Sequence, residues 1–82
     1  MKKEIDELEK ALDDNYKDGV YHIVKLGNLG CLCARNNDEP MTLYVIDCLE
    51  TEKQEALKRN VVKFVPEIDK QIDRIEEVMN KW

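Results

Sequence analysis

The chain has 82 residues, of which 43% are hydrophobic and 38% are charged, so it can bury one core and is too apolar for a disordered segment. Its 18 acidic and 13 basic residues give a net charge of −5, which argues against generic nucleic-acid binding, because that activity needs clustered lysine and arginine. The sequence has no long apolar run and no signal peptide pattern after Met1, so we expect a single cytoplasmic domain over residues 1–82.

The first predicted element is a helix over about residues 2–14. Its apolar residues recur at helical spacing and form one stripe, which consists of Met1, Ile5, Leu8 and Leu12. Loop-forming residues from Asp13 to Gly19 end this helix. Acids at a helix C-terminus oppose the helix dipole, so Asp14 belongs either to a solvated loop or to a charged patch for a partner.

Three short strands are predicted next, over residues 20–26, 29–35 and 41–48. These segments are rich in β-branched and aromatic residues. The pair Gly27-Asn28 has the composition of a two-residue hairpin turn, in which glycine takes a positive φ. The polar residues 36–40 form a second turn. Together these signals predict an antiparallel three-stranded sheet.

Side-chain alternation divides the apolar residues of the predicted strands between two faces. The face expected to form the core carries Val20, His22, Val24, Leu26, Leu29, Cys31, Cys33, Met41, Leu43 and Val45. The other face is amphipathic and carries Tyr21, Ile23, Leu32, Ala34, Tyr44, Ile46 and Cys48. One layer of helices covers only one face, so we expect the second face, with its two tyrosines, to bind a partner or a second copy.

The C-terminal third is predicted to be helical. The sequence Thr51-Glu52-Lys53-Gln54 fits a capping box and predicts a helix over about 52–63. Pro66 favours a break near Val65 and a second helix over 66 to about 81, and the alternative is a fourth strand over 61–65. The fold class is therefore α+β, with a three-stranded antiparallel sheet, one N-terminal helix and two C-terminal helices, or one kinked helix, packed mainly on one face.

The last predicted helix also has a short coiled-coil rhythm. Its residues Ile68, Ile72, Ile75, Met79 and Trp82 are spaced by four and three. We interpret this stripe as packing within the fold, with self-association through the last helix as the alternative.

No motif in the chain predicts catalysis, a metal site or a cofactor. Cys31, Cys33 and His22 fall on one predicted face, and thiolate and imidazole groups are zinc ligands, but a fourth ligand is not evident. A Cys–His nucleophilic pair lacks oxyanion donors. The three cysteines are expected to be reduced thiols, and Cys31 and Cys33 are expected to pack in the core.

The order of predicted elements resembles that of small acidic phage-encoded anti-CRISPR proteins, which inhibit an RNA-guided nuclease by mimicking DNA. The local resemblance is the turn Arg35-Asn36-Asn37-Asp38-Glu39 leading into Leu43-Tyr44-Val45-Ile46. In that family, acids and amides of such a turn, with acids of the first loop and later helices, occupy the basic groove that reads DNA. The resemblance implies partner contacts at Asp14, Asn37, Asp38, Glu39, Glu67 and Asp69.

These observations predict a small non-enzymatic inhibitor that binds a protein through an acidic and tyrosine-bearing surface. Its expected partner is a nucleic-acid-binding effector nuclease with a basic groove, without direct contact to nucleic acid or membrane. The alternative is a self-associating structural or adaptor protein, a homodimer through the second sheet face or the last helix.

Overall fold

The structure, a computed structural model, describes residues 2–14 and 16–82, and the side chains of residues 2, 4, 12–14 and 16–18 lie outside that description. The described residues form four α-helices and one short 3-10 helix, and they contain no strand. In chain order the elements are α1 (Lys2–Asp14), α2 (Tyr16–Arg35), α3 (Glu39–Lys58), η1 (Val62–Phe64) and α4 (Val65–Met79). The predicted α+β class is therefore wrong.

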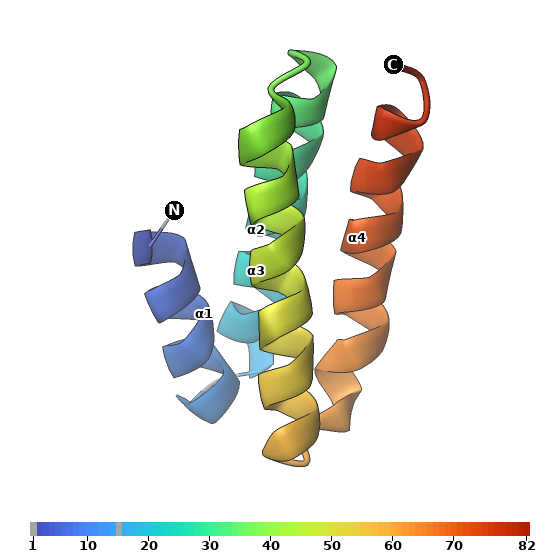
Figure 1. Cartoon of the computed structure of the whole chain (residues 1–82). Coiled ribbons are helices and arrows are strands. Elements are labelled where there is room, and N and C mark those ends of the chain that lie inside the picture. The colour runs from blue at the N-terminus through green and yellow to red at the C-terminus, as the bar shows by residue number, and fades with distance from the viewer. Residues whose placement is uncertain (1, 15) are drawn as a thin grey trace.

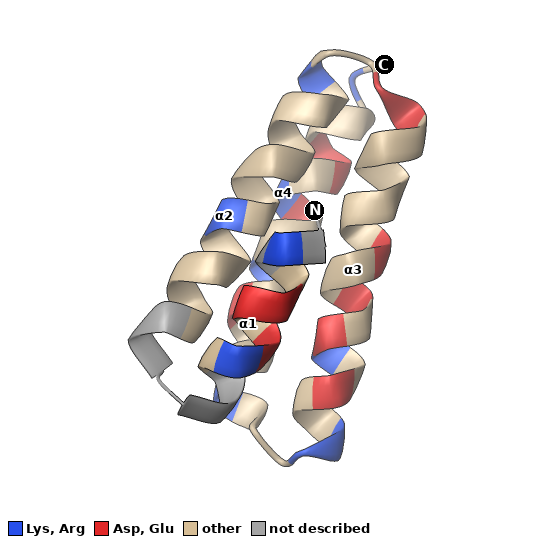
Figure 2. Ribbon diagram, turned by 90° about the vertical axis from the view of Figure 1, so that its left-hand side faces the viewer, with Lys and Arg blue, Asp and Glu red and all other residues tan. Residues whose placement is uncertain are grey.

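The four α-helices form an elongated antiparallel bundle of 37 × 22 × 18 Å. The helices α2, α3 and α4 run side by side along its length, and α1 is shorter and covers only the lower part of the molecule (Figure 1). Seen from the side, α1 lies in front of α2 and α3, with α4 behind them (Figure 2). The most extensive contacts join α2 to α4, and α1 packs mainly on α2.

The first two predicted strands, 20–26 and 29–35, are the single helix α2. Its buried residues recur every three or four positions, at Gly19, Ile23, Leu26, Gly27, Gly30, Cys31 and Ala34, which is the spacing of one helix face. The expected hairpin turn at Gly27-Asn28 lies in the middle of this helix. The two predicted sheet faces therefore do not separate core from surface, because residues from both of them are buried in α2.

Glycine allows α2 to approach α4 closely. A Cβ atom on Gly27 would collide with the Gln71 side chain, and one on Gly30 would collide with Ile75. At the N-terminal end of α2, a Cβ on Gly19 would lie 2.6 Å from Phe64. These glycines therefore act as packing residues, Gly27 and Gly30 against α4 and Gly19 against η1, and not as turn residues.

The third predicted strand, 41–48, belongs to α3. Asp38 caps this helix: its side chain accepts a hydrogen bond from the Met41 backbone N–H at 3.3 Å, and its carbonyl accepts the Thr42 hydroxyl at 2.7 Å. Pro40 occupies the first turn, where its missing N–H has no intrahelical acceptor anyway. The expected polar turn over 36–40 does exist, but it joins two helices.

That turn is closed by a left-handed residue at the end of α2. Asn37 has φ = 58°, its N–H donates to Ala34 O at 3.0 Å, and the Asp38 N–H donates to Cys33 O at 3.0 Å. This pair of bonds is the Schellman arrangement that ends helices. Asn60, with φ = 61°, ends α3 in the same way, and there the Val61 N–H donates to Ala56 O at 2.8 Å.

The predictions for the two ends of the chain are partly confirmed. The N-terminal helix over 2–14 and the last helix from about 66 agree with α1 and α4. The break lies at 59–61, earlier than predicted, and the alternative fourth strand over 61–65 is wrong because 62–64 form η1. The capping box at Thr51 is also wrong, since Thr51 and Gln54 lie inside α3.

The core lies between all four helices. Its buried cluster contains Leu8, Ile23, Leu26, Cys31, Val45, Leu49, Phe64, Ile68, Ile72 and Ile75. The isoleucine stripe of α4 thus packs inside the bundle and is not available to a second copy. Leu43, which we expected in the core, is 46% exposed.

Candidate functional site

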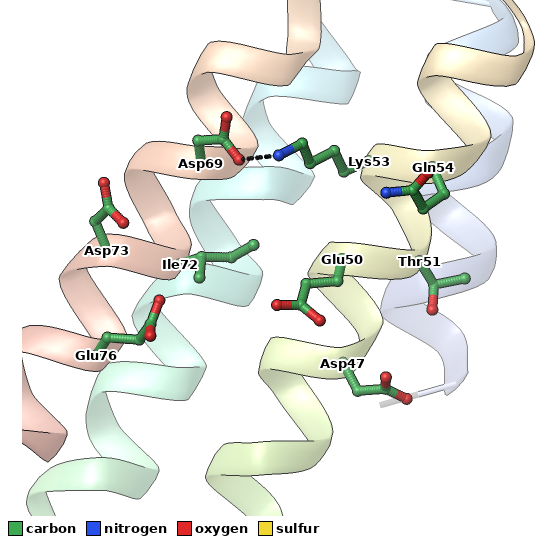
Figure 3. A pocket seen from close by; sticks show the side chains of 9 residues that line it. All are labelled: Asp47, Glu50, Thr51, Lys53, Gln54, Asp69, Ile72, Asp73 and Glu76. Carbon is green, nitrogen blue, oxygen red and sulfur yellow. Dashed lines mark ion pairs between the residues drawn. The ribbon is translucent and has the colours of Figure 1, made fainter.

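A groove with a volume of about 680 Å³ lies between α3 and α4. Side chains from the two helices project into it from opposite sides (Figure 3). Nine residues line it: Asp47, Glu50, Thr51, Lys53, Gln54, Asp69, Ile72, Asp73 and Glu76. Five of them are acids and one is a lysine, so we call this feature the acidic groove.

Helical spacing explains how these carboxylates come together. On α3, Asp47 and Glu50 are three residues apart and point to one side, and on α4, Asp69, Asp73 and Glu76 follow at intervals of four and three. Such positions lie on one face of a helix, and the two acidic faces border the same space (Figure 3). The apolar floor contributed by Ile72 is small.

One ion pair crosses the groove. Lys53 Nζ lies 2.9 Å from Asp69 Oδ1, and both side chains are partly exposed, at 32% and 47%. Among the described residues, no ion pair involves the other four groove acids. The groove therefore keeps an excess of negative charge, which a concave low-dielectric surface focuses.

The acidic residues predicted from the sequence are not brought into one patch. Asn37, Asp38 and Glu39 are exposed in the turn between α2 and α3 at one end of the bundle, whereas Glu67 and Asp69 lie near the start of α4 at the other end (Figure 1). Of these five residues only Asp69 lines the acidic groove.

Several predicted partner residues have identifiable local roles. Asp38 caps α3, and Glu67 accepts a hydrogen bond from Gln71 Nε2 at 2.9 Å. Tyr21 and Tyr44 are exposed, at 63% and 45%, on different helices. The side chain of Asp14 lies outside the described residues.

The sequence reasoning missed most of the acidic groove. Asp69 was expected as a partner contact beside Glu67, and Asp47 was placed near the end of a strand. The signal that would have found the groove is the spacing of acids by three or four in two successive segments, but this signal has meaning only once both segments are helices.

A second unusual group is the carboxyl of Glu52, which is 0% exposed. Neither of its oxygens accepts a hydrogen bond from a donor group of the protein. Burial raises the pKa of Glu52 to about 7, and the nearby Glu9 carboxyl of α1 adds to this rise through its charge and through a hydrogen bond to the protonated form.

The cysteines and the histidine do not form a chemical site. Cys31 and Cys48 are buried, Cys33 is half-buried, and all three are free thiols. On a helix, Cys31 and Cys33 point in nearly opposite directions, so the predicted shared face is wrong. Burial raises the pKa of the Cys48 thiol, which disfavours the reactive thiolate.

Two further observations concern metal ions and membranes. Among the described residues, no group of three or more His, Cys, Asp or Glu side chains is placed to hold a metal ion. In the same part of the chain, every helix is too short or too polar to cross a membrane.

Comparison of the chain with protein-family models, with characterised proteins and with solved structures gives no match.

Proposed function

We propose that this chain is a small non-enzymatic protein-binding module that docks its acidic groove on a basic surface of a partner protein. The observation that supports this proposal is the composition of the groove, in which five carboxylates and a single lysine line one concave surface. Complementary charge across an interface gives specificity and fast association.

The charge distribution favours a protein partner over nucleic acid. Phosphates would be repelled by the groove and by the net charge of −5. An arginine or lysine side chain entering the groove would meet Asp73 or Glu76, whose carboxylates have no ion-pair partner among the described residues. Bidentate pairing with arginine is the strongest contact that such carboxylates offer.

An inhibitory role follows if the partner uses the same basic surface to bind nucleic acid, because the groove would then compete with phosphate. The predicted resemblance to anti-CRISPR proteins depended on a three-strand meander, and the described residues form helices in its place. The proposal therefore keeps the acidic docking and does not depend on membership of that family. The alternative homodimer through a second sheet face loses its surface for the same reason.

The test uses charge reversal in two matched double variants. Asp73→Lys with Glu76→Lys changes the groove, and Asp6→Lys with Glu77→Lys makes the same change of net charge at exposed positions outside it. A partner is captured from a bacterial lysate at low salt, identified and purified, and its Kd is measured for each variant by calorimetry.

We expect the groove variant to bind more than tenfold more weakly at low salt, which is about 1.4 kcal/mol, and to differ less from the parent at high salt because ions screen the pairs. The control should stay within about threefold of the parent, or about 0.7 kcal/mol. Equal loss in both variants would mean that only net charge matters, and unchanged binding in the groove variant would contradict the proposal.

A further inference from the structure

The buried carboxyl of Glu52 has no evident structural purpose in the bundle. It is 0% exposed, and neither oxygen receives a hydrogen bond from the protein. An ionised carboxylate in such a place loses its hydration without compensation, which is among the most costly arrangements in a protein interior. The folded bundle therefore favours the neutral, protonated form of Glu52.

The group that faces Glu52 from the neighbouring helix is a second carboxyl, that of Glu9 on α1. Two carboxylates can only accept hydrogen bonds, so they repel each other until one of them takes up a proton and becomes a donor. On α3 itself, Arg59 favours the charged form of Glu52 and Glu55 opposes it. From α4, Asp69 reaches α3 at Lys53, where the two are paired.

A second titratable contact joins α1 to α2. His22 Nδ1 lies 3.4 Å from Glu7 Oε2, with the histidine side chain only 14% exposed, and this nitrogen has no hydrogen-bond partner. This polar contact attaches α1 to α2 and does not involve Glu52.

The attachment of α1 is mostly to one neighbour. It packs extensively on α2 and contributes Leu8 to the core, whereas its contact with α3 is small. The helices α2, α3 and α4 each pack extensively on at least two others. A change of charge at the α1–α3 contact therefore acts on the helix with the fewest extensive contacts in the bundle.

We propose that α1 is a proton-controlled latch, which stays docked on α2 and α3 while Glu52 carries a proton and opens more often as the pH rises through neutrality. Opening hydrates the Glu52 carboxylate and separates it from Glu9. Because a proton is released when the latch opens, thermodynamic linkage requires the docking equilibrium to shift with pH.

The test measures amide hydrogen exchange of the full chain by NMR, corrected for the intrinsic exchange rate, at about pH 5.5 and about pH 8. A carboxyl that titrates at about 4.5 when exposed and at about 7 when docked shifts the docking equilibrium roughly thirtyfold over this interval. The protection of the Leu8 and Ala11 amides should fall by this factor. At the higher pH these amides should be less protected than that of Ile72 in α4.

The decisive variant is Glu52→Gln, with Glu55→Gln as the matched control one turn further along α3. The first should reduce the loss of α1 protection to less than about threefold, because an amide cannot lose a proton in this range. The control removes one negative charge from a partly exposed side chain, and this charge is the smallest of the causes that raise the pKa of Glu52, so most of the pH response should remain.

A second measurement keeps the proposal testable if Glu52→Gln folds poorly. The side-chain carboxyl of Glu52 is titrated in the unmodified protein by its ¹³C chemical shift, and a midpoint near pH 7 is expected. A midpoint below about 5, which is the range of an ordinary glutamate, would overturn the latch. Equal protection of the α1 and α4 amides at both pH values would also overturn it. The same holds for a Glu52→Gln variant that keeps the full pH response.

Discussion

Replacement of Gly30 by alanine tests the close approach of α2 and α4 on which the whole bundle depends. The added methyl group would collide with the Cδ1 of Ile75, and it would also lie 2.8 Å from Ile75 Cγ1 and 3.1 Å from Val45 Cγ1. Ile75 and Val45 are both 0% exposed. Both neighbours lie inside the core, so either Ile75 must change its conformation or the helices must move apart.

Two opposing effects determine the size of the change. Alanine is a better helix former than glycine by about 0.5–1 kcal/mol, whereas overpacking a well-filled core costs about 1–3 kcal/mol. Because the predicted overlaps involve a buried branched side chain, we expect packing to outweigh propensity. Gly30→Ala should therefore destabilise the protein by roughly 1–2 kcal/mol.

Urea denaturation followed by circular dichroism measures this change, and a double-mutant cycle identifies its cause. Ile75→Val removes the Cδ1 atom that meets the new methyl group, and alone it should cost about 0.5–1.5 kcal/mol. When Gly30→Ala is already present, Ile75→Val should cost less than it does alone, because it relieves the overlap. Lys25→Ala, at an exposed position of the same helix, is the control and should stay within about 0.5 kcal/mol. A Gly30→Ala variant that is more stable than the parent would refute the packing argument.

Three further predictions concern stability. The pKa of Glu52 is raised from 4.5 to about 7 in the fold. Its contribution to the free energy of unfolding is therefore fully present below about pH 4.5, and about 3 kcal/mol is lost as the pH rises through 7. Urea denaturation at a series of pH values should show this fall in the parent and a smaller one in Glu52→Gln. Trp82→Phe removes the hydrogen bond from Trp82 Nε1 to Ala34 O at 2.7 Å and should lower the free energy of unfolding by about 0.5–1.5 kcal/mol. Leu49→Ala, at a fully buried position, should cost about 2–5 kcal/mol, whereas Leu43→Ala, at a half-exposed one, should cost less than about 1 kcal/mol; comparable losses would contradict the assigned core.

The first and last helices were predictable because their apolar residues mark the buried face. In α4, Ile68, Ile72 and Ile75 repeat at helical spacing and are all buried, so the periodicity of the sequence and that of the structure agree. In α1, Leu8 belongs to such a stripe as well. Short loops and the polar turn near Asn37 were also predicted, since turn residues keep their meaning whichever elements they connect.

The helix α2 was mispredicted because its buried face is partly made of glycine. Gly27 and Gly30 lower helix propensity and resemble turn residues, while Tyr21 and Leu32 are apolar but exposed. The apolar pattern therefore alternates like that of a strand, although the burial pattern is helical. The close contact with α4 that favours glycine is a tertiary feature, which local propensity does not contain.

The helix α3 was mispredicted for a related reason. Its buried positions include Thr42 and Glu52, whereas Leu43 and Tyr44 are exposed, so hydrophobicity does not identify its inner face. The start of the helix, Asp38-Glu39-Pro40, has the composition of a cap followed by proline in the first turn, but these residues were predicted to form a turn between strands. The acidic groove was missed as a consequence, because Asp47 and Glu50 share a face only in a helix.

The two proposals depend on different sides of α3, and this makes them separable. Successive residues of a helix are rotated by about 100°, so Glu50 and Gln54 point to the α4 side, whereas Glu52 points to the α1 side and faces Glu9. The exposed carboxylates of the groove keep their hydration, so their ionisation costs little free energy, and salt screens their charges. The buried carboxyl loses its hydration, so its ionisation costs much more, and ions in solution do not reach it. Partner binding through the groove should therefore respond mainly to ionic strength, and the docking of α1 should respond mainly to pH, so that a failure of one proposal leaves the other standing.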